Sequence, residues 1–137
     1  MQAQNLGLVL PAADVPGAAE FYTAHLGFTA HVVLSWYASL GHPDVPGAFV
    51  DLVRTGHPAA GAAQAPAGGA RGVMLALLVA DVDAEYRRLR AAGLELLTEV
   101  TDEPWGQRRF QLQGPDAVVV ELVQRTAPDA EWLAANP

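Results

Sequence analysis

The sequence contains an internal repeat, and each copy ends with an acidic residue inside an apolar stretch. The first copy starts at the apolar residues 6–10 and ends around Asp51, and the second starts at 73–79 and ends around Glu121. Asp51 and Glu121 are 70 positions apart, which is close to the offset between the other matching features. A nearly constant offset predicts a duplicated β-α-β unit. Two such units can curl around a shared cavity, and we then expect the two acids to point toward it from two sides.

Each copy also carries the signals of one helix. Asp14 precedes an apolar helical stripe, and Gly27 follows it. Aspartate is a preferred N-cap residue, and glycine commonly follows the last turn of a helix. In the second copy, Asp81 or Asp83 has the N-cap position and Gly93 has the terminal one. We therefore expect the two helices to begin and end at equivalent points of the repeat.

Apolar segments around these helices predict the strands. The first strand is expected to end at Pro11, because proline cannot donate a hydrogen bond to a ladder. Turns are expected at Gly41-His42-Pro43-Asp44 and at Gly114-Pro115-Asp116. The remaining predicted strands cover 28–34, 36–40, 48–53, 94–100, 108–112 and 118–123.

The two copies are joined by a segment of different composition. Residues 57–72 are almost entirely Ala, Gly and Pro, which bury little surface and are typical of linkers. We therefore expect a single domain, 1–137, that is made of two repeats at about 6–56 and 73–124.

The composition excludes several classes of function. At 137 residues, the chain is long enough to bury a real core within one domain. Its net charge of −7 and its 8 Lys and Arg argue against a nucleic-acid partner, because binding to phosphates requires clustered cations. The absence of cysteine excludes disulfides, thiolate metal sites and a thiol nucleophile. The sequence has no signal-peptide pattern and no apolar run of about 20 residues, so we expect a cytoplasmic protein without a membrane partner.

Four motifs follow one another along the chain at a characteristic spacing. They lie at Asp14 to Phe28, Asp81 to Gly93, Glu103-Pro104-Trp105-Gly106-Gln107-Arg108 and Gly114 to Leu122. They resemble motifs of the vicinal oxygen chelate superfamily, which contains glyoxalase I, extradiol dioxygenases and bleomycin resistance proteins, and the resemblance covers essentially residues 6–125. The resemblance implies an α+β fold of two tandem βαβββ modules, which form an open, curved, mixed sheet around a cleft.

The resemblance also implies where a metal would bind. Metal-dependent members carry one ligand on the first strand and one on the last strand of each module, typically His or Gln first and Glu last. The matching positions in this sequence are Gly7, Asp51, Met74 and Glu121. Glycine has no side chain, and a thioether is a poor ligand for hard or borderline divalent ions. We therefore expect no metal site and no cofactor.

The two acids leave two interpretations open. A carboxylate inside an apolar strand is costly unless it is paired, hydrogen-bonded or exposed to a wet cavity. One interpretation is an internal ion pair, for which Arg54, Arg108 and Arg109 are available. The other interpretation is that Asp51 and Glu121 face the cleft and receive amine or amide groups of a ligand.

Aromatic residues and histidines supply the other candidates for a binding site. Aromatic residues on or next to the predicted strands can stack on a flat ligand, and core packing is the alternative for each of them. Among the histidines, His31 lies on a predicted strand and is expected to line the cleft, whereas the others suit the surface or helix ends. The complete predicted ligand-binding set is Trp36, Phe49, Asp51, Trp105, Arg108, Phe110, Glu121 and His31.

Two functions from different classes remain. The first is metal-independent binding and sequestration of a flat, partly aromatic small molecule, such as a cationic or peptidic antibiotic, in the manner of a resistance protein. The second is catalysis, by a divalent-metal-dependent lyase, isomerase or dioxygenase, or by a metal-free enzyme with Glu121 as general base. We favour binding, because two of the four ligand positions lack a useful donor atom. Unpaired sheet edges further predict a homodimer, and the tail pair Trp132-Leu133 is expected to pack as a short helix on the body or on a second subunit.

Overall fold

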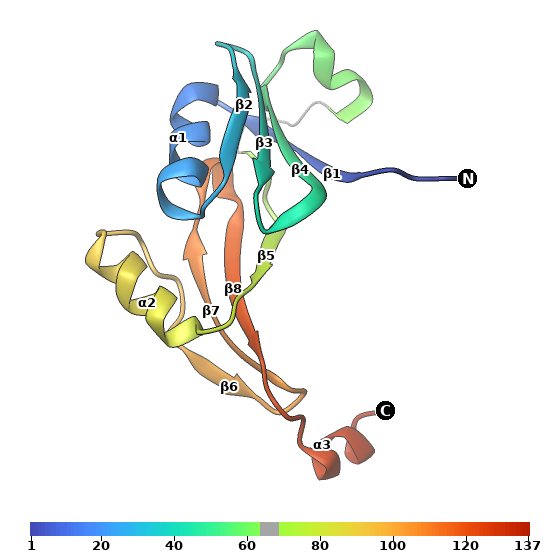
Figure 1. Cartoon of the computed structure of the whole chain (residues 1–137), viewed down its shortest axis with the longest axis vertical. Coiled ribbons are helices and arrows are strands. Elements are labelled where there is room, and N and C mark those ends of the chain that lie inside the picture. Colours follow the sequence, from blue (N-terminus) through green and yellow to red (C-terminus); the bar gives the residue numbers. More distant parts are fainter. Residues whose placement is uncertain (64–68) are drawn as a thin grey trace. The chain divides into compact units, whose positions relative to one another are not determined.

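The computed structural model describes residues 1–63 and 69–137, so part of the predicted linker 57–72 lies outside the described residues. The chain divides into two compact units, one formed by residues 1–71 and 115–117 and the other by residues 72–114 and 118–137. Each unit holds one four-stranded mixed sheet with a helix packed on one of its faces, which confirms the α+β class (Figure 1). In the part of the chain that the structure describes, no helix combines the length and the apolar character needed to cross a membrane.

The two sheets have the same topology, which confirms the tandem βαβββ modules. The first unit contains β1 (Leu6–Ala12), α1 (Val15–His25), β2 (Thr29–Val33), β3 (Tyr37–His42) and β4 (Val45–Arg54). The second contains β5 (Met74–Leu78), α2 (Val82–Ala91), β6 (Thr101–Glu103), β7 (Gln107–Gln113), β8 (Val119–Arg125) and the terminal α3 (Ala130–Ala135). The strand orders are β1-β4-β3-β2 and β5-β8-β7-β6. In each module the first and last strands are parallel, and the other pairs are antiparallel.

Matching caps explain why both helices begin where the sequence predicts. Asp14 and Asp81 each accept a hydrogen bond from the backbone amide three residues later, at 3.1 and 2.9 Å. Gly27 and Gly93 follow the two helices with φ of +75° and +78°, a left-handed conformation that favours glycine. Of the two candidates for the second cap, Asp81 is therefore the N-cap residue and Asp83 is not.

Each sheet has one side that packs against its helix and one side that carries the acid. Side chains alternate between the two sides of a strand, and in β3 and β7 the buried residues follow this alternation. The helix-facing core residues include Leu10, Leu40 and Leu52 in the first unit and Phe110, Leu112 and Leu122 in the second, all at most 2 % exposed. We call the opposite side the acid face. It carries Tyr37, Ser39, Phe49 and Asp51 in the first unit and Arg109, Gln111 and Glu121 in the second.

The sequence predicts that the first strand ends at Pro11, but β1 continues to Ala12. Because β1 is an edge strand of its sheet, only one of its sides pairs with a neighbouring strand, and an edge position tolerates the missing amide of proline.

Residues 94–100 do not form the predicted regular strand. An isolated bridge joins Leu96 to Leu112, and β6 begins only at Thr101. At this point the backbone amide of Gln111 donates to the side-chain Oγ1 of Thr98 at 2.8 Å instead of to a carbonyl. A side-chain acceptor that replaces a backbone acceptor interrupts the ladder, and the segment is therefore irregular although it is apolar.

Candidate functional site

Glu121 is the buried acid of the second unit, and its charge is balanced within the sheet. Its exposure is only 4 %. From β7, Arg109 Nη1 donates to Glu121 Oε1 at 2.5 Å, and Gln111 Nε2 donates to the same oxygen at 3.1 Å. Gln111 lies directly opposite Glu121 in the ladder, and Arg109 lies one pleat further along on the same face. A carboxylate that is both paired and hydrogen-bonded avoids much of the cost of its burial.

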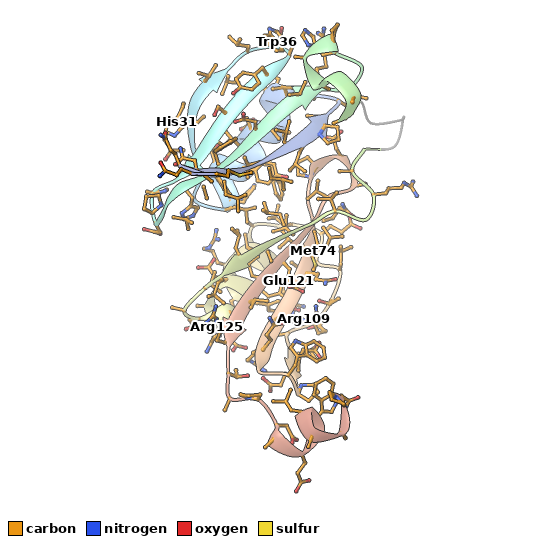
Figure 2. All side chains as sticks on the ribbon, turned by 90° about the vertical axis from the view of Figure 1, so that its right-hand side faces the viewer. His31, Trp36, Met74, Arg109, Glu121 and Arg125 are labelled. Atoms are coloured by element: carbon orange, nitrogen blue, oxygen red, sulfur yellow. The ribbon has the colours of Figure 1, made fainter. Side chains whose placement is uncertain are left out.

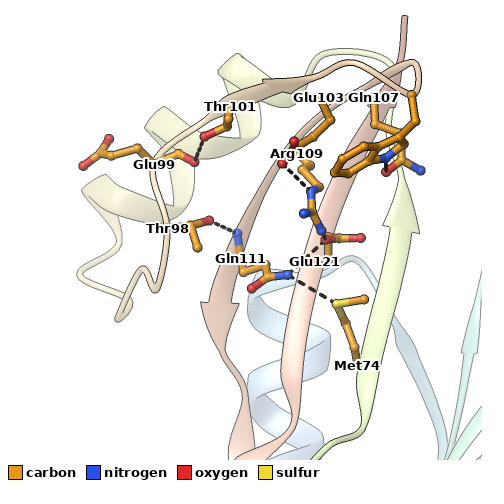
Figure 3. A network of polar contacts seen from close by, with 10 residues as sticks. Met74, Thr98, Glu99, Thr101, Glu103, Gln107, Arg109, Gln111 and Glu121 are labelled. Carbon is orange, nitrogen blue, oxygen red and sulfur yellow. Dashed lines mark hydrogen bonds and ion pairs between the residues drawn. The ribbon is translucent and has the colours of Figure 1, made fainter. Parts of the chain in front are cut away.

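Arg109 is the centre of the polar network in Figure 3. Its Nε also donates to Glu103 Oε1 at 3.0 Å, so that one guanidinium bridges two carboxylates. The guanidinium carbon lies 5.3 Å from the centre of the Trp105 ring, which is a favourable cation–π distance. The hydrogen bond to Glu121 raises the pKa of Arg109, and the bond to Glu103 adds to this effect. Arg109 is therefore a permanent cation held between two acids and an indole.

A small cavity is formed beside this network. Its volume is about 90 Å³, and its lining residues are Thr98, Thr101, Glu103, Arg109 and Gln111. Pockets for drug-sized ligands measure roughly 300–1,000 Å³, so this cavity has room for one compact polar group only. The indole that stacks on the guanidinium is 40 % exposed, and its ring nitrogen donates to Gln107 Oε1 at 2.8 Å. The arrangement can hold a polar group in the cavity and an aromatic ring on the neighbouring indole.

Asp51 occupies the equivalent position in the first unit, but it is satisfied differently. Tyr37 donates its hydroxyl proton to Asp51 Oδ2 at 3.0 Å. Asp51 Oδ1 is buried and has no hydrogen-bond partner among the described residues. Among the described residues, Glu121 thus forms the internal ion pair that is one of the two interpretations, whereas Asp51 accepts from the hydroxyl of Tyr37.

The positions that would hold a metal in this type of fold do not fit one. Gly7 has no side chain that could bind a metal, and the ring of Phe49 on the neighbouring strand fills the space where a Cβ atom would lie. Met74 offers only a thioether, and Glu121 is already bound to the guanidinium of Arg109, whose charge repels a divalent cation. Across residues 1–63 and 69–137, no three His, Asp or Glu side chains gather closely enough to hold a metal ion.

Two predicted site residues lie on the helix-facing side of β7 and not on the acid face. Phe110 is fully buried and packs edge-to-face against Tyr86 of α2, with ring centres 5.1 Å apart. Arg108 donates from Nε and Nη2 to the Asp83 carboxylate, both at 2.8 Å, and also pairs with Asp102 at 3.0 Å. Arg108 and Phe110 therefore do not share the face of Glu121: the first forms ion pairs and the second packs in the core.

Two other predicted residues of the first unit, His31 and Trp36, lie apart from one another (Figure 2). Trp36 follows β2, and its ring stacks on His57 with centres 4.3 Å apart and an angle of 13°. His31 is exposed on β2, and Phe49 is half-buried. Trp36 is half-buried, whereas Trp105 is 40 % exposed, so Trp105 is the more accessible of these two indoles.

The predicted set lacks three residues that bind the acids, namely Tyr37, Arg109 and Gln111. Strand alternation contains the signal that identifies them. Phe110 and Leu112 are apolar and alternate with Arg109 and Gln111, so the polar pair must share the face opposite to the core.

Comparisons with known proteins agree with this architecture. Residues 6–122 match the family model of the Glyoxalase/Bleomycin resistance protein/Dioxygenase superfamily. A solved glyoxalase/bleomycin resistance protein/dioxygenase from Nocardioides is 27 % identical, with a TM-score of 0.73 over 92 % of this chain and 85 % of that one. TnmS3, an antibiotic binding protein from Streptomyces sp. CB03234, is 25 % identical, with a TM-score of 0.69 over 92 % of this chain and 97 % of that one.

A more distant structure shares the fold. The bleomycin-binding protein from Streptomyces verticillus, solved with copper(II)-bleomycin, is 22 % identical, with a TM-score of 0.63 over 89 % of this chain and 96 % of that one. No curated protein matches the sequence.

Proposed function

Because the chain belongs to the glyoxalase/bleomycin resistance protein/dioxygenase superfamily, we propose that it binds and sequesters a flat, partly aromatic small molecule without a metal and without changing it chemically. One observation carries this proposal. The acid that would be a metal ligand, Glu121, is bound to Arg109 at 2.5 Å. A guanidinium in this place supplies neither a Lewis acid nor an open coordination position, but it does build a fixed polar surface.

The charges and acceptor atoms of the site favour a ligand with a donor-rich, cationic group. Glu103 and Glu121 carry two negative charges and Arg109 carries one positive charge, so the formal charge of the network is −1. Gln111 uses its amide nitrogen to bind Glu121 and Met74, which leaves its carbonyl oxygen as an acceptor. A primary ammonium or carboxamide is small enough for a cavity of about 90 Å³ and supplies the donors that these oxygens accept.

The aromatic part of the ligand is assigned to Trp105. This indole is 40 % exposed and borders the polar network through Arg109. Stacking on an exposed, rigid indole favours flat ring systems. The similarity to TnmS3, an antibiotic binding protein, supports a ligand of this kind.

The proposal is tested with two cationic aromatic probes, metal-free bleomycin and doxorubicin, by calorimetric titration of the protein purified without chelator. We expect one probe or both to bind and Trp105→Ala to weaken that binding by about 2-fold to 12-fold, since an aromatic contact contributes about 0.5–1.5 kcal/mol. Trp36→Ala is the matched control and should leave the affinity within about 2-fold. Melting temperatures of both variants separate loss of binding from loss of folding.

Metal analysis of the same preparation tests the competing function. Zinc, nickel, iron or manganese near one equivalent per chain, lost on Glu121→Ala, would overturn metal-independent binding and favour a lyase, isomerase or dioxygenase.

We also propose that the protein is a homodimer. Apolar side chains are exposed on edge strands of both sheets, with Leu6 of β1 at 80 % and Leu78 of β5 at 58 %. Unpaired apolar edges of this kind are commonly covered by a second copy. Sedimentation at micromolar concentration is expected to show a dimer, and a monomer as the sole species would refute this proposal.

A further inference from the structure

The C-terminal segment is fixed to the turn between β6 and β7. The backbone amide of Thr126 donates to the carbonyl of Gly106 at 2.9 Å, and that of Asp129 donates to the carbonyl of Pro104 at 2.8 Å. Gly106 has a φ of +99°, and a Cβ atom there would lie 3.1 Å from the Thr126 carbonyl oxygen. Glycine therefore permits both the turn and the close approach of the tail.

The N-cap of α3 then sets the position of Trp132. Asp129 Oδ1 accepts from the backbone amides of Glu131 and Trp132 at 2.9 and 3.0 Å. This places Trp132 in the first turn of α3, with its ring centre 5.8 Å from that of Trp105 and the two planes at 50°. Because the tail is attached by backbone bonds on both sides of Trp105, the relative position of the two indoles is built into the second unit.

The two indoles continue the polar network of the candidate site. Trp132 contacts Trp105, and the guanidinium of Arg109 lies over the ring of Trp105. A six-residue helix is not stable by itself, and α3 is mostly exposed. Trp132 on this helix therefore adds little to the core. It adds aromatic surface beside Trp105, which is itself 40 % exposed, at a place that a ligand can reach.

We propose that Trp132 is a ligand-binding residue: it forms an aromatic corner with Trp105 that holds the flat part of the ligand, while the donor group of the ligand lies in the cavity next to Glu103 and Gln111. This inference rests on the proposed function. The tilt of 50° between the rings allows a flat ring to lie against one indole while its edge meets the other, and both arrangements are favourable for aromatic groups. The corner favours ligands whose ring system extends beyond Trp105.

The test compares Trp132→Ala with Leu133→Ala, which truncates the neighbouring apolar side chain, 42 % exposed, on the same helix. Doxorubicin is the probe, and its own fluorescence anisotropy reports binding without any tryptophan signal. Trp132→Ala is expected to weaken binding by about 2-fold to 12-fold, whereas Leu133→Ala should stay within about 2-fold. Trp132→Phe should retain part of the affinity. Melting temperatures of all variants should remain close to that of the parent protein, because α3 is peripheral.

A measurement without ligand checks the contact between the indoles. In a Trp36→Phe background, adding Trp132→Ala leaves Trp105 as the sole tryptophan. Its quenching by acrylamide is expected to be stronger than after Trp132→Phe, which keeps an aromatic neighbour. Equal quenching in the two variants would show that the rings do not cover one another and would overturn the aromatic corner.

The binding results distinguish failure of the role of Trp132 from failure of the proposed function. Unchanged binding by Trp132→Ala, together with weakened binding by Trp105→Ala, would overturn the role of Trp132 and leave the proposed function intact. Equal weakening by Trp132→Ala and Leu133→Ala would also overturn it, because the helix and not the indole would then matter. If neither doxorubicin nor metal-free bleomycin bound to the parent protein, the proposed function and this inference would both be refuted.

Discussion

Replacing Arg109 with methionine tests whether the buried acid of the second unit depends on its guanidinium. Arg108 provides a matched control, because the two neighbouring arginines have similar side-chain exposures, 26 % and 29 %. Their partners differ: the side chain of Glu121 is 6 % exposed, whereas those of Asp83 and Asp102 are 41 % and 73 % exposed. Arg109→Met also removes the pair with Glu103 and the contact with the Trp105 ring, so the burial of Glu121 is the main difference between the two variants and the double variant below is needed to isolate it.

The expected magnitudes follow from this difference. Removing one partner of a buried ion pair costs about 3–5 kcal/mol. Gln111 continues to donate to Glu121 at 3.1 Å, so we expect about 2–4 kcal/mol for Arg109→Met. An exposed ion pair contributes little to stability because water and salt screen it, so Arg108→Met should cost clearly less than Arg109→Met. For a chain of this size, 1 kcal/mol corresponds to roughly 3–5 °C in Tm.

Urea unfolding of the two variants, with calorimetric melting as a second measure, provides the data. The single variant Glu121→Gln and the double variant Arg109→Met/Glu121→Gln complete a cycle: removing the unpaired charge should restore at least half of the stability that Arg109→Met loses. Equal costs for the two arginine variants, or strictly additive effects in the double variant, would refute the view that the pair with Glu121 is buried and coupled.

Three further predictions concern the first unit. Burial, with a smaller contribution from the carboxylate of Asp116, raises the pKa of Tyr22 to about 12. The folded state then holds the phenol proton more tightly than the unfolded state, so its contribution to stability is complete below about pH 10 and decreases by up to about 3 kcal/mol between about pH 10 and 12. Tyr22→Phe should lack this alkaline decrease in urea unfolding, and parallel decreases in both proteins would contradict the assignment. Tyr37→Phe removes the donor to Asp51 and should cost about 1.5–3 kcal/mol. Tyr86→Phe, which removes an exposed bond to Glu99, should cost clearly less, and equal costs of the two variants would contradict the role of burial at Asp51. Gly7→Ala places a methyl group in the ring of Phe49 and should destabilise by about 1–3 kcal/mol. Gly7→Ala should cost less in a Phe49→Ala background, because the ring is then absent. An equal cost in both backgrounds would show that the ring of Phe49 moves aside.

The sequence predicts the repeat and its helices well, because these features depend on local signals. Asp14 and Asp81 are N-caps for chemical reasons that act within four residues. The strand prediction for 94–100 is wrong because its outcome depends on a contact between Thr98 and Gln111, thirteen positions away. An apolar stretch predicts that a segment packs against the core, but it does not predict a side chain that takes the place of a backbone acceptor.

The candidate site is predicted only in part, for a similar reason. Asp51 and Glu121 are recognisable because an acid in an apolar strand needs an explanation. Arg108 and Arg109 are adjacent, and choosing between them requires the register of β7, which follows from the buried Phe110. The contact between Trp105 and Trp132 is formed across a turn, a strand pair and a tail, and no local pattern indicates it.

The register of the two modules shows how the repeat has diverged at its acids. Ser39 and Gln111 lie directly opposite Asp51 and Glu121, and Tyr37 and Arg109 lie two residues before them on the same strands. The donor to each acid therefore comes from the same place in both modules, but one donor is a neutral phenol and the other is a cation. Under the proposed function, the cation of the second unit fixes an acceptor-rich cavity beside an exposed indole, and this arrangement suits a ligand whose donor group lies next to a flat ring.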